Sequence, residues 1–81
     1  MKLILDIETN GFLDVLDKIH CMVFKDIETQ KVYSYNPDQI NEGLNLLKKA
    51  TLIIGHSVMG FDLPAIEKVT GYKYEGEILD T

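Results

Sequence analysis

The strongest constraint on the fold is a helix start that lies between two short apolar runs. Asn36-Pro37-Asp38 combines an asparagine cap, a proline in the first turn and an acid near the positive helix end. The predicted helix continues to Lys48-Lys49, with residues 40, 44 and 47 on one apolar face. The apolar runs at 2–8 and 52–55 predict strands before and after it. This order favours a sheet with helices packed on its faces.

The first half of the chain predicts an antiparallel hairpin. Segments 20–25 and 31–35 are rich in β-branched and aromatic residues, which favours strands. The polar segment 26–30 between them is typical of a hairpin loop. Segment 2–8 shows little alternation of polar and apolar residues, which predicts a strand buried on both faces.

The second half of the chain predicts a second helix and a last strand. We expect this helix to begin with Asp62 as its cap and to end at Gly71. Ile78-Leu79 is expected to begin the strand. Together the elements predict one α/β domain over residues 1–81, built on a mixed sheet with an antiparallel opening hairpin.

Composition and charge exclude several classes of protein. No apolar run is long enough to cross a bilayer, so a membrane protein is not expected. The 81 residues include 8 lysines, no arginine and 13 acids, giving a net charge of −5, so a broad cationic face for nucleic acid is not expected either. Cys21 is the single cysteine and can form neither an internal disulfide nor a zinc site alone, which indicates an intracellular protein.

The tetrapeptide Asp-Ile-Glu-Thr occurs twice, at 6–9 and 26–29. We interpret the second copy as a solvated hairpin loop rather than a repeat, because the flanking residues differ. In the first copy Asp6 and Glu8 lie two apart at a strand end, so both side chains project from one face. An exposed strand end would explain this pair without any function. A bound cation would also explain it, since two like charges beside apolar residues need compensation.

Asp62 is the third candidate carboxylate. If strands 2–8 and 52–55 lie parallel and adjacent, their carboxyl ends meet the start of the second helix, where open α/β sheets place ligands. A plain capping role for Asp62 competes with this hypothesis only in part, because one carboxylate can cap a helix and bind a metal. Three oxygen donors suit Mg²⁺ or Mn²⁺. Two such ions form the usual apparatus for displacement at phosphorus.

These residues resemble the DEDD family of 3′–5′ exonucleases, the proofreading domains of DNA polymerases with an RNase H-like fold. Segment 6–12, Asp-Ile-Glu-Thr-Asn-Gly-Phe, is similar to the first family motif, and segment 55–66 is similar to the second. His20-Cys21 and the segment 33–37 are similar to family A polymerases of short-tailed bacteriophages. Asp80-Thr81 matches the Asp-Thr that follows the next strand in such domains.

The resemblance implies a set of roles for the site residues. Asp6 would bridge two metal ions, Glu8 would bind the ion on the nucleophile side, and Asp62 would bind the other. The implied substrate is the 3′ end of single-stranded DNA, and the implied cofactor is Mg²⁺ or Mn²⁺. A core role for Phe12 and a loop-anchoring role for Phe61 stay open as alternatives. The implied substrate-binding residues are Thr9, Asn10, Phe12, Ser57 and Phe61.

Two departures from the family pattern change the expected activity. Ser57 stands where the family usually has Asn, and the third motif, a Tyr or His followed four residues later by Asp, is absent. The resemblance therefore implies a C-terminally incomplete, impaired exonuclease domain in the cytoplasm of an infected bacterial host. The alternatives are a non-catalytic polymerase fragment that self-associates or binds the remainder of a polymerase, and an unrelated small α/β domain with solvated acids.

Overall fold

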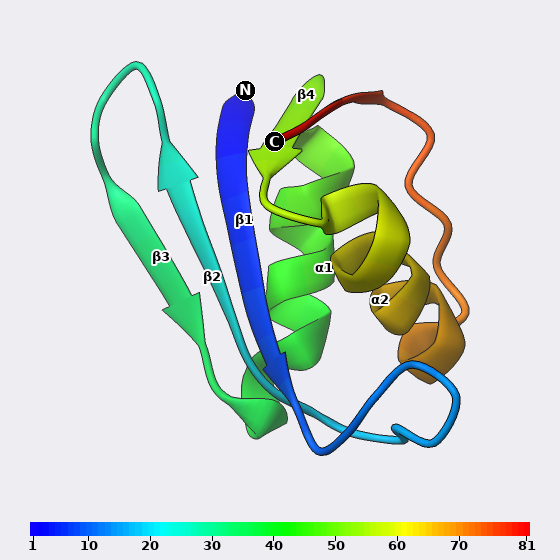
Figure 1. Ribbon diagram of the computed structural model, residues 1–81. Helices are drawn as coiled ribbons and strands as arrows, with labels where there is room; N and C mark the ends of the chain where they lie inside the picture. The colour runs from blue at the N-terminus through cyan, green and yellow to red at the C-terminus, as the bar shows by residue number, and fades with distance from the viewer.

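Five strands form one mixed sheet in the computed structural model, which describes residues 1–81 (Figure 1). Their order across the sheet is β3-β2-β1-β4-β5. The strands are β1 (Lys2–Thr9), β2 (Ile19–Asp26), β3 (Val32–Tyr35), β4 (Leu52–Gly55) and β5 (Glu77–Asp80). The helices are α1 (Ile40–Lys49) and α2 (Leu63–Thr70), each preceded by a short turn of another helical type, the 3₁₀ turn η1 (Pro37–Gln39) and the π turn η2 (Val58–Asp62). The predicted α/β class, opening hairpin and last strand are confirmed.

Strand β1 lies at the centre of the sheet and organises it. It pairs antiparallel with β2 from Leu3 to Thr9 and parallel with β4 only from Lys2 to Ile4. Strand β4 ends at Gly55, so the second half of β1 has no strand on that side. The turn η2 packs against β1, β4 and β5 at this end of the sheet. The fold therefore brings the acid pair of β1 and the start of α2 to one place.

Both helices cover the same face of the sheet (Figure 1). Leu3, Leu5 and Ile7 of β1 point into the core, whereas Ile4 between them is 39% exposed. The expectation that this strand is buried on both faces, with helices on both faces of the sheet, is therefore wrong. Apolar side chains also line up on the open face, because Ile4 and Ile54 are cross-strand partners there. Because of this second apolar row, the first half of β1 shows no alternation of polar and apolar residues in the sequence.

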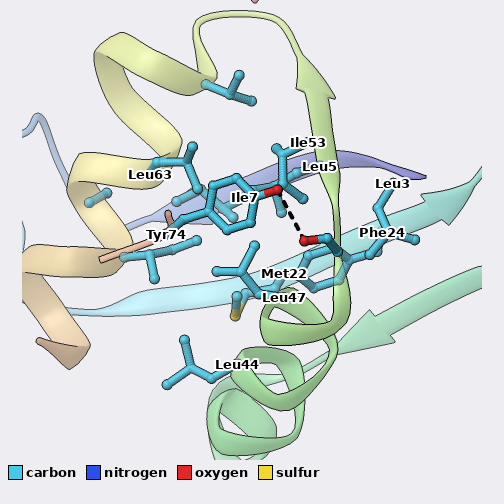
Figure 2. Packing of buried hydrophobic residues seen from close by; sticks show 14 of the residues in the cluster. Leu3, Leu5, Ile7, Met22, Phe24, Leu44, Leu47, Ile53, Leu63 and Tyr74 are labelled. Atoms are coloured by element: carbon cyan, nitrogen blue, oxygen red, sulfur yellow. Dashed lines mark hydrogen bonds between the residues drawn. The ribbon is translucent and has the colours of Figure 1, made fainter. Parts of the chain in front are cut away.

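The core lies between the sheet and the two helices (Figure 2). Phe24, Met22 and Leu47 are fully buried at its centre. Tyr74, which precedes β5, closes the core beneath α2, and its hydroxyl donates to the carbonyl oxygens of Ala50 at 3.2 Å and Glu77 at 3.3 Å. A buried tyrosine needs a partner for its hydroxyl, and these two carbonyls fix the start of β5 beside β4.

The predicted start of the first helix is confirmed, with a 3₁₀ first turn. The Asn36 side chain accepts from the Asp38 N–H at 3.1 Å, and the Gln39 side chain accepts from the Asn36 N–H at 3.1 Å, which forms a capping box. Gly43 is buried in α1, where an added Cβ would lie 2.9 Å from the Met22 sulfur. Glycine there allows the helix to approach the sheet closely.

The second Asp-Ile-Glu-Thr copy forms the loop between β2 and β3, as predicted. The Asp26 carboxylate accepts from the N–H groups of Glu28 at 2.8 Å and Thr29 at 3.2 Å. Gln30 completes the loop in the left-handed region, with φ of 67°. The carboxylate of this copy is thus used by the turn itself. No helix in the structure has the length and apolar character needed to span a membrane.

Candidate functional site

A cleft of about 530 Å³ lies at the carboxyl end of β1. One wall comes from the end of β1 and the turn after it, and the other comes from the segment between β4 and α2. Six of the eight lining residues are candidates from the sequence, and the other two are Gly11 and His56. The lining residues are Glu8, Thr9, Gly11, Phe12, His56, Ser57, Phe61 and Asp62.

The end of β1 presents Asp6 and Glu8 away from the core. Both are exposed, and their alternation with buried Leu5 and Ile7 places them on the open face. The pairing register shifts between Glu8 and Thr9, so β1 bends where it reaches the cleft. Glu8 lines the cleft, whereas Asp6 is not among the lining residues but lies close enough for its charge to act on Asp62.

Asp62 is the buried carboxylate of the site. The sequence predicted it as the cap of the second helix, and this role is wrong, because its backbone is helical and its side chain makes no capping hydrogen bond. The π turn η2 continues directly into α2, and Pro64, at the second position of this helix, has no N–H for a cap to bind. Asp62 is only 5% exposed, and its Oδ2 atom has no hydrogen-bond partner.

The electrostatics of Asp62 reflect this environment. The pKa of its carboxyl is raised from 3.8 to about 6, chiefly by burial, with the nearby charge of Asp6 as the next cause and a smaller effect of the same sign from Asp80. The N–H of Ile7, on the free edge of β1, opposes this rise in pKa. A carboxyl held in this way is a candidate for a functional role, since it must either keep its proton or have a cation nearby to compensate its charge.

The remaining candidates fall into two groups. Thr9, Phe12, Ser57 and Phe61 line the cleft with Glu8 and Asp62. Phe12 is 81% exposed, which excludes a core role, whereas Phe61 both lines the cleft and packs against the core.

Asn10 does not line the cleft. Its side chain accepts from the N–H groups of Asp17 and Lys18, both at 3.1 Å, and donates to the Asp17 carboxylate at 2.6 Å. It closes the loop that carries Phe12. His56 was missed by sequence reasoning, although it directly precedes Ser57 and could have been found from its place in the second motif.

The chemistry of the donors fits a hard divalent cation. Glu8, Asp62 and Asp6 supply only carboxylate oxygens, and the unpartnered Oδ2 of Asp62 is a buried acceptor that a cation would satisfy. No three His, Cys, Asp or Glu side chains come close enough to form a complete metal site in the structure. Mg²⁺ ordinarily takes one or two protein carboxylates and fills its other positions with water or substrate phosphates. The residues present meet that smaller requirement.

Comparison with known proteins finds similarity to the DNA polymerases of two phages. The chain is 34% identical over 71 residues to the DNA-directed DNA polymerase of Enterobacteria phage T3, which covers 83% of this chain and 10% of that protein. It is 34% identical over 68 residues to the DNA-directed DNA polymerase of Escherichia phage T7, covering 79% and 10%. The chain resembles a segment of phage DNA polymerases. It spans about a tenth of the length of these curated relatives. No protein-family model matches the chain.

The predicted similarity to phage DNA polymerases is thus confirmed. The similarity extends over about four fifths of this chain, so it involves the sheet and not only one short motif. The exonuclease assignment, the cation and the roles of the cleft residues stay predictions.

Proposed function

We propose that the chain carries a metal-dependent 3′–5′ exonuclease site of the DEDD type on an RNase H-like fold, related to phage DNA polymerases and acting on the 3′ end of single-stranded DNA. The observation that carries the proposal is the buried, unpartnered Oδ2 of Asp62, held next to Asp6 at a cleft that Glu8 also lines. The similarity to two phage DNA polymerases supports DNA as the ligand.

Glu8 and Asp62 would hold the cation from the cleft, and Asp6, whose charge acts on Asp62, would be the third carboxylate of the set. A divalent ion bound there would supply Lewis-acid activation and neutralise phosphate charge. The chain needs this neutralisation, because its net charge is −5 and its cleft contains two carboxylates and no lysine. Without a cation the site repels a phosphodiester.

The cleft walls are suited to a terminal nucleotide. Phe12 exposes most of its ring at the cleft, and Phe61 supplies a second aromatic wall. Stacking of bases on such rings is independent of sequence and contributes about 1–3 kcal/mol per base. Thr9 fixes the turn of the wall that follows β1, since its hydroxyl donates to the Gly11 carbonyl oxygen at 2.7 Å. These residues would orient the end of a strand toward Asp62.

The test compares two glutamates from the repeated tetrapeptide. Glu8→Gln changes the cleft, and Glu28→Gln changes the same motif position in the exposed hairpin loop. Calorimetry with Mn²⁺ and a Mn²⁺-dependent assay of 5′-mononucleotide release from a labelled single strand are run on both, with Asp6→Ala alongside. Glu8→Gln and Asp6→Ala should lose cation binding and release, while Glu28→Gln keeps both. Unchanged activity in Asp6→Ala, or no Mn²⁺ binding at millimolar concentration in the unaltered chain, would refute the proposal.

A second candidate function is self-association or binding to the remainder of a polymerase. The open face of the sheet favours it, because Val32, Lys25, Ile4, Ile54 and Leu79 form one cross-strand row there. Ile4, Val32 and Leu79 are 39%, 58% and 53% exposed. Light scattering of the unaltered chain and of Ile4→Lys tests it. A monomer at all concentrations would contradict self-association, and a dimer abolished by Ile4→Lys would support it.

A further inference from the structure

The segment that carries Asp62 is held by a residue far along the chain. Asp80, at the end of β5, accepts through Oδ1 from the Ser57 N–H at 3.0 Å and through Oδ2 from the Met59 N–H at 2.9 Å. Ser57 directly precedes η2, and Met59 lies in its first turn. The sequence predicted a local cap at Asp62, and the structure instead caps this turn from Asp80.

The capped segment has an unusual backbone. Ser57 has a φ of 59°, in the left-handed region that costs an L-residue about 1–2 kcal/mol. Its carbonyl then accepts from the N–H groups of Phe61 at 2.8 Å and Asp62 at 3.4 Å, which closes the π turn. Single π turns of this kind are frequent at functional sites. The orientation of Asp62 therefore depends on Ser57 keeping this conformation.

Asp80 is itself fixed by the sheet. It pairs with Gly55 in the parallel ladder, and the next residue, Thr81, donates its N–H to the Gly55 carbonyl oxygen at 2.9 Å. The carboxylate thus extends from a paired strand to the turn on the neighbouring strand. Its negative charge also lies near Asp62 and disfavours ionisation of that group. Because the charge of Asp80 makes Asp62 harder to ionise, we explain the position of Asp80 by the two backbone hydrogen bonds that it accepts.

We propose that Asp80 is a positioning residue for the cation site: by binding the Ser57 and Met59 N–H groups it holds the π turn that aims the Asp62 carboxylate at the cleft. The inference rests on the proposed function, and it adds a residue from outside the cleft lining.

The experiment measures Mn²⁺ affinity by calorimetry in Asp80→Ala and Asp80→Asn. Supporting partners of metal ligands typically contribute about 10–100-fold to affinity, so Asp80→Ala should weaken binding by about that factor. Asparagine keeps one oxygen acceptor and loses the charge, so Asp80→Asn should retain part of the affinity. Equal losses in both variants would mean that charge alone acts, which would overturn the inference.

A matched control separates positioning from general stability. Asp26 also caps a turn through two backbone N–H groups, in the hairpin loop on the far side of the sheet. Asp26→Ala should lower the melting temperature and leave Mn²⁺ affinity unchanged at a temperature where circular dichroism shows a folded chain. If Asp80→Ala does not fold, Asp80→Asn carries the same comparison, together with amide NMR shifts of residues 57–62.

The outcomes distinguish the two proposals. Normal Mn²⁺ binding in the unaltered chain with unchanged binding in Asp80→Ala refutes the role of Asp80 and leaves the proposed function standing. No Mn²⁺ binding in the unaltered chain refutes the proposed function and the role of Asp80 with it. Weakened binding in Asp80→Ala, partial recovery in Asp80→Asn and no change in Asp26→Ala support the role of Asp80.

Discussion

Replacing Asp62 with asparagine should stabilise the folded chain at neutral pH. The buried carboxyl has a pKa of about 6, against 3.8 in the unfolded chain, so ionising it is harder in the folded state. This difference corresponds to about 3 kcal/mol. Water in the cleft screens one side of the group, so we expect about half of that, roughly 1.5 kcal/mol. Asparagine keeps the shape of the side chain and removes the charge.

The sign of the effect follows from the two pKa values. Below pH 3.8 the carboxyl is protonated in both states, so it adds no pH-dependent penalty. As the pH rises from 3.8 to 6, only the unfolded chain loses the proton, and the stability of the unaltered protein falls. Above pH 6 the penalty is fully present and constant. The difference in the free energy of unfolding between Asp62→Asn and the unaltered chain should therefore be smallest near pH 3.5 and level off above pH 6.

Urea unfolding followed by circular dichroism between pH 3.5 and 8 measures this difference. Asp14→Asn, a change at an exposed carboxylate, is the control and should show no such trend. Adding Mn²⁺ at about ten times its dissociation constant should stabilise the unaltered chain by about 1.4 kcal/mol and leave Asp62→Asn unaffected. A destabilised Asp62→Asn at pH 7.5, or a difference that does not change with pH, would refute the reasoning about the buried charge.

Three further changes test the packing around the site. Gly55→Ala should destabilise by about 1–3 kcal/mol in urea unfolding, because the added Cβ would lie 2.7 Å from the Leu5 carbonyl oxygen and against the Val58 side chain; a neutral result would mean that β4 can move away from β1. Tyr74→Phe should cost about 1 kcal/mol in the same assay, since the carbonyl oxygens of Ala50 and Glu77 lose the hydroxyl that donates to them. Gln30→Gly should raise stability by about 0.5–1 kcal/mol, because glycine adopts the positive φ of this loop without strain, and a lower stability would contradict that account.

The elements of the fold were predictable because their signals are local. The Asn36-Pro37-Asp38 start and the Gly71 stop, with φ of 80°, depend on backbone chemistry within one turn, and both are confirmed. The number of covered faces was not predictable, because the apolar side chains Ile4 and Ile54 on the open face look the same in sequence as core residues.

The candidate site was predictable in its residues and not in its geometry. The paired motifs identified Glu8, Ser57 and Asp62, which line one cleft. They could not show that Asp62 is no cap, because that depends on a π turn held by Asp80 through contacts 21 and 23 residues apart. Such long-range support leaves no periodic pattern in the sequence.

The order of the strands also has a consequence for how the chain acquires its structure. Strands β2 and β3 are joined by a short loop, so their contacts close quickly, on the microsecond scale typical of hairpins. Leu3 of β1 pairs with Ile53, at the far end of a long stretch of chain, and this closure costs more entropy. The hairpin should therefore form early, whereas the two walls of the cleft come together only in the last steps of folding.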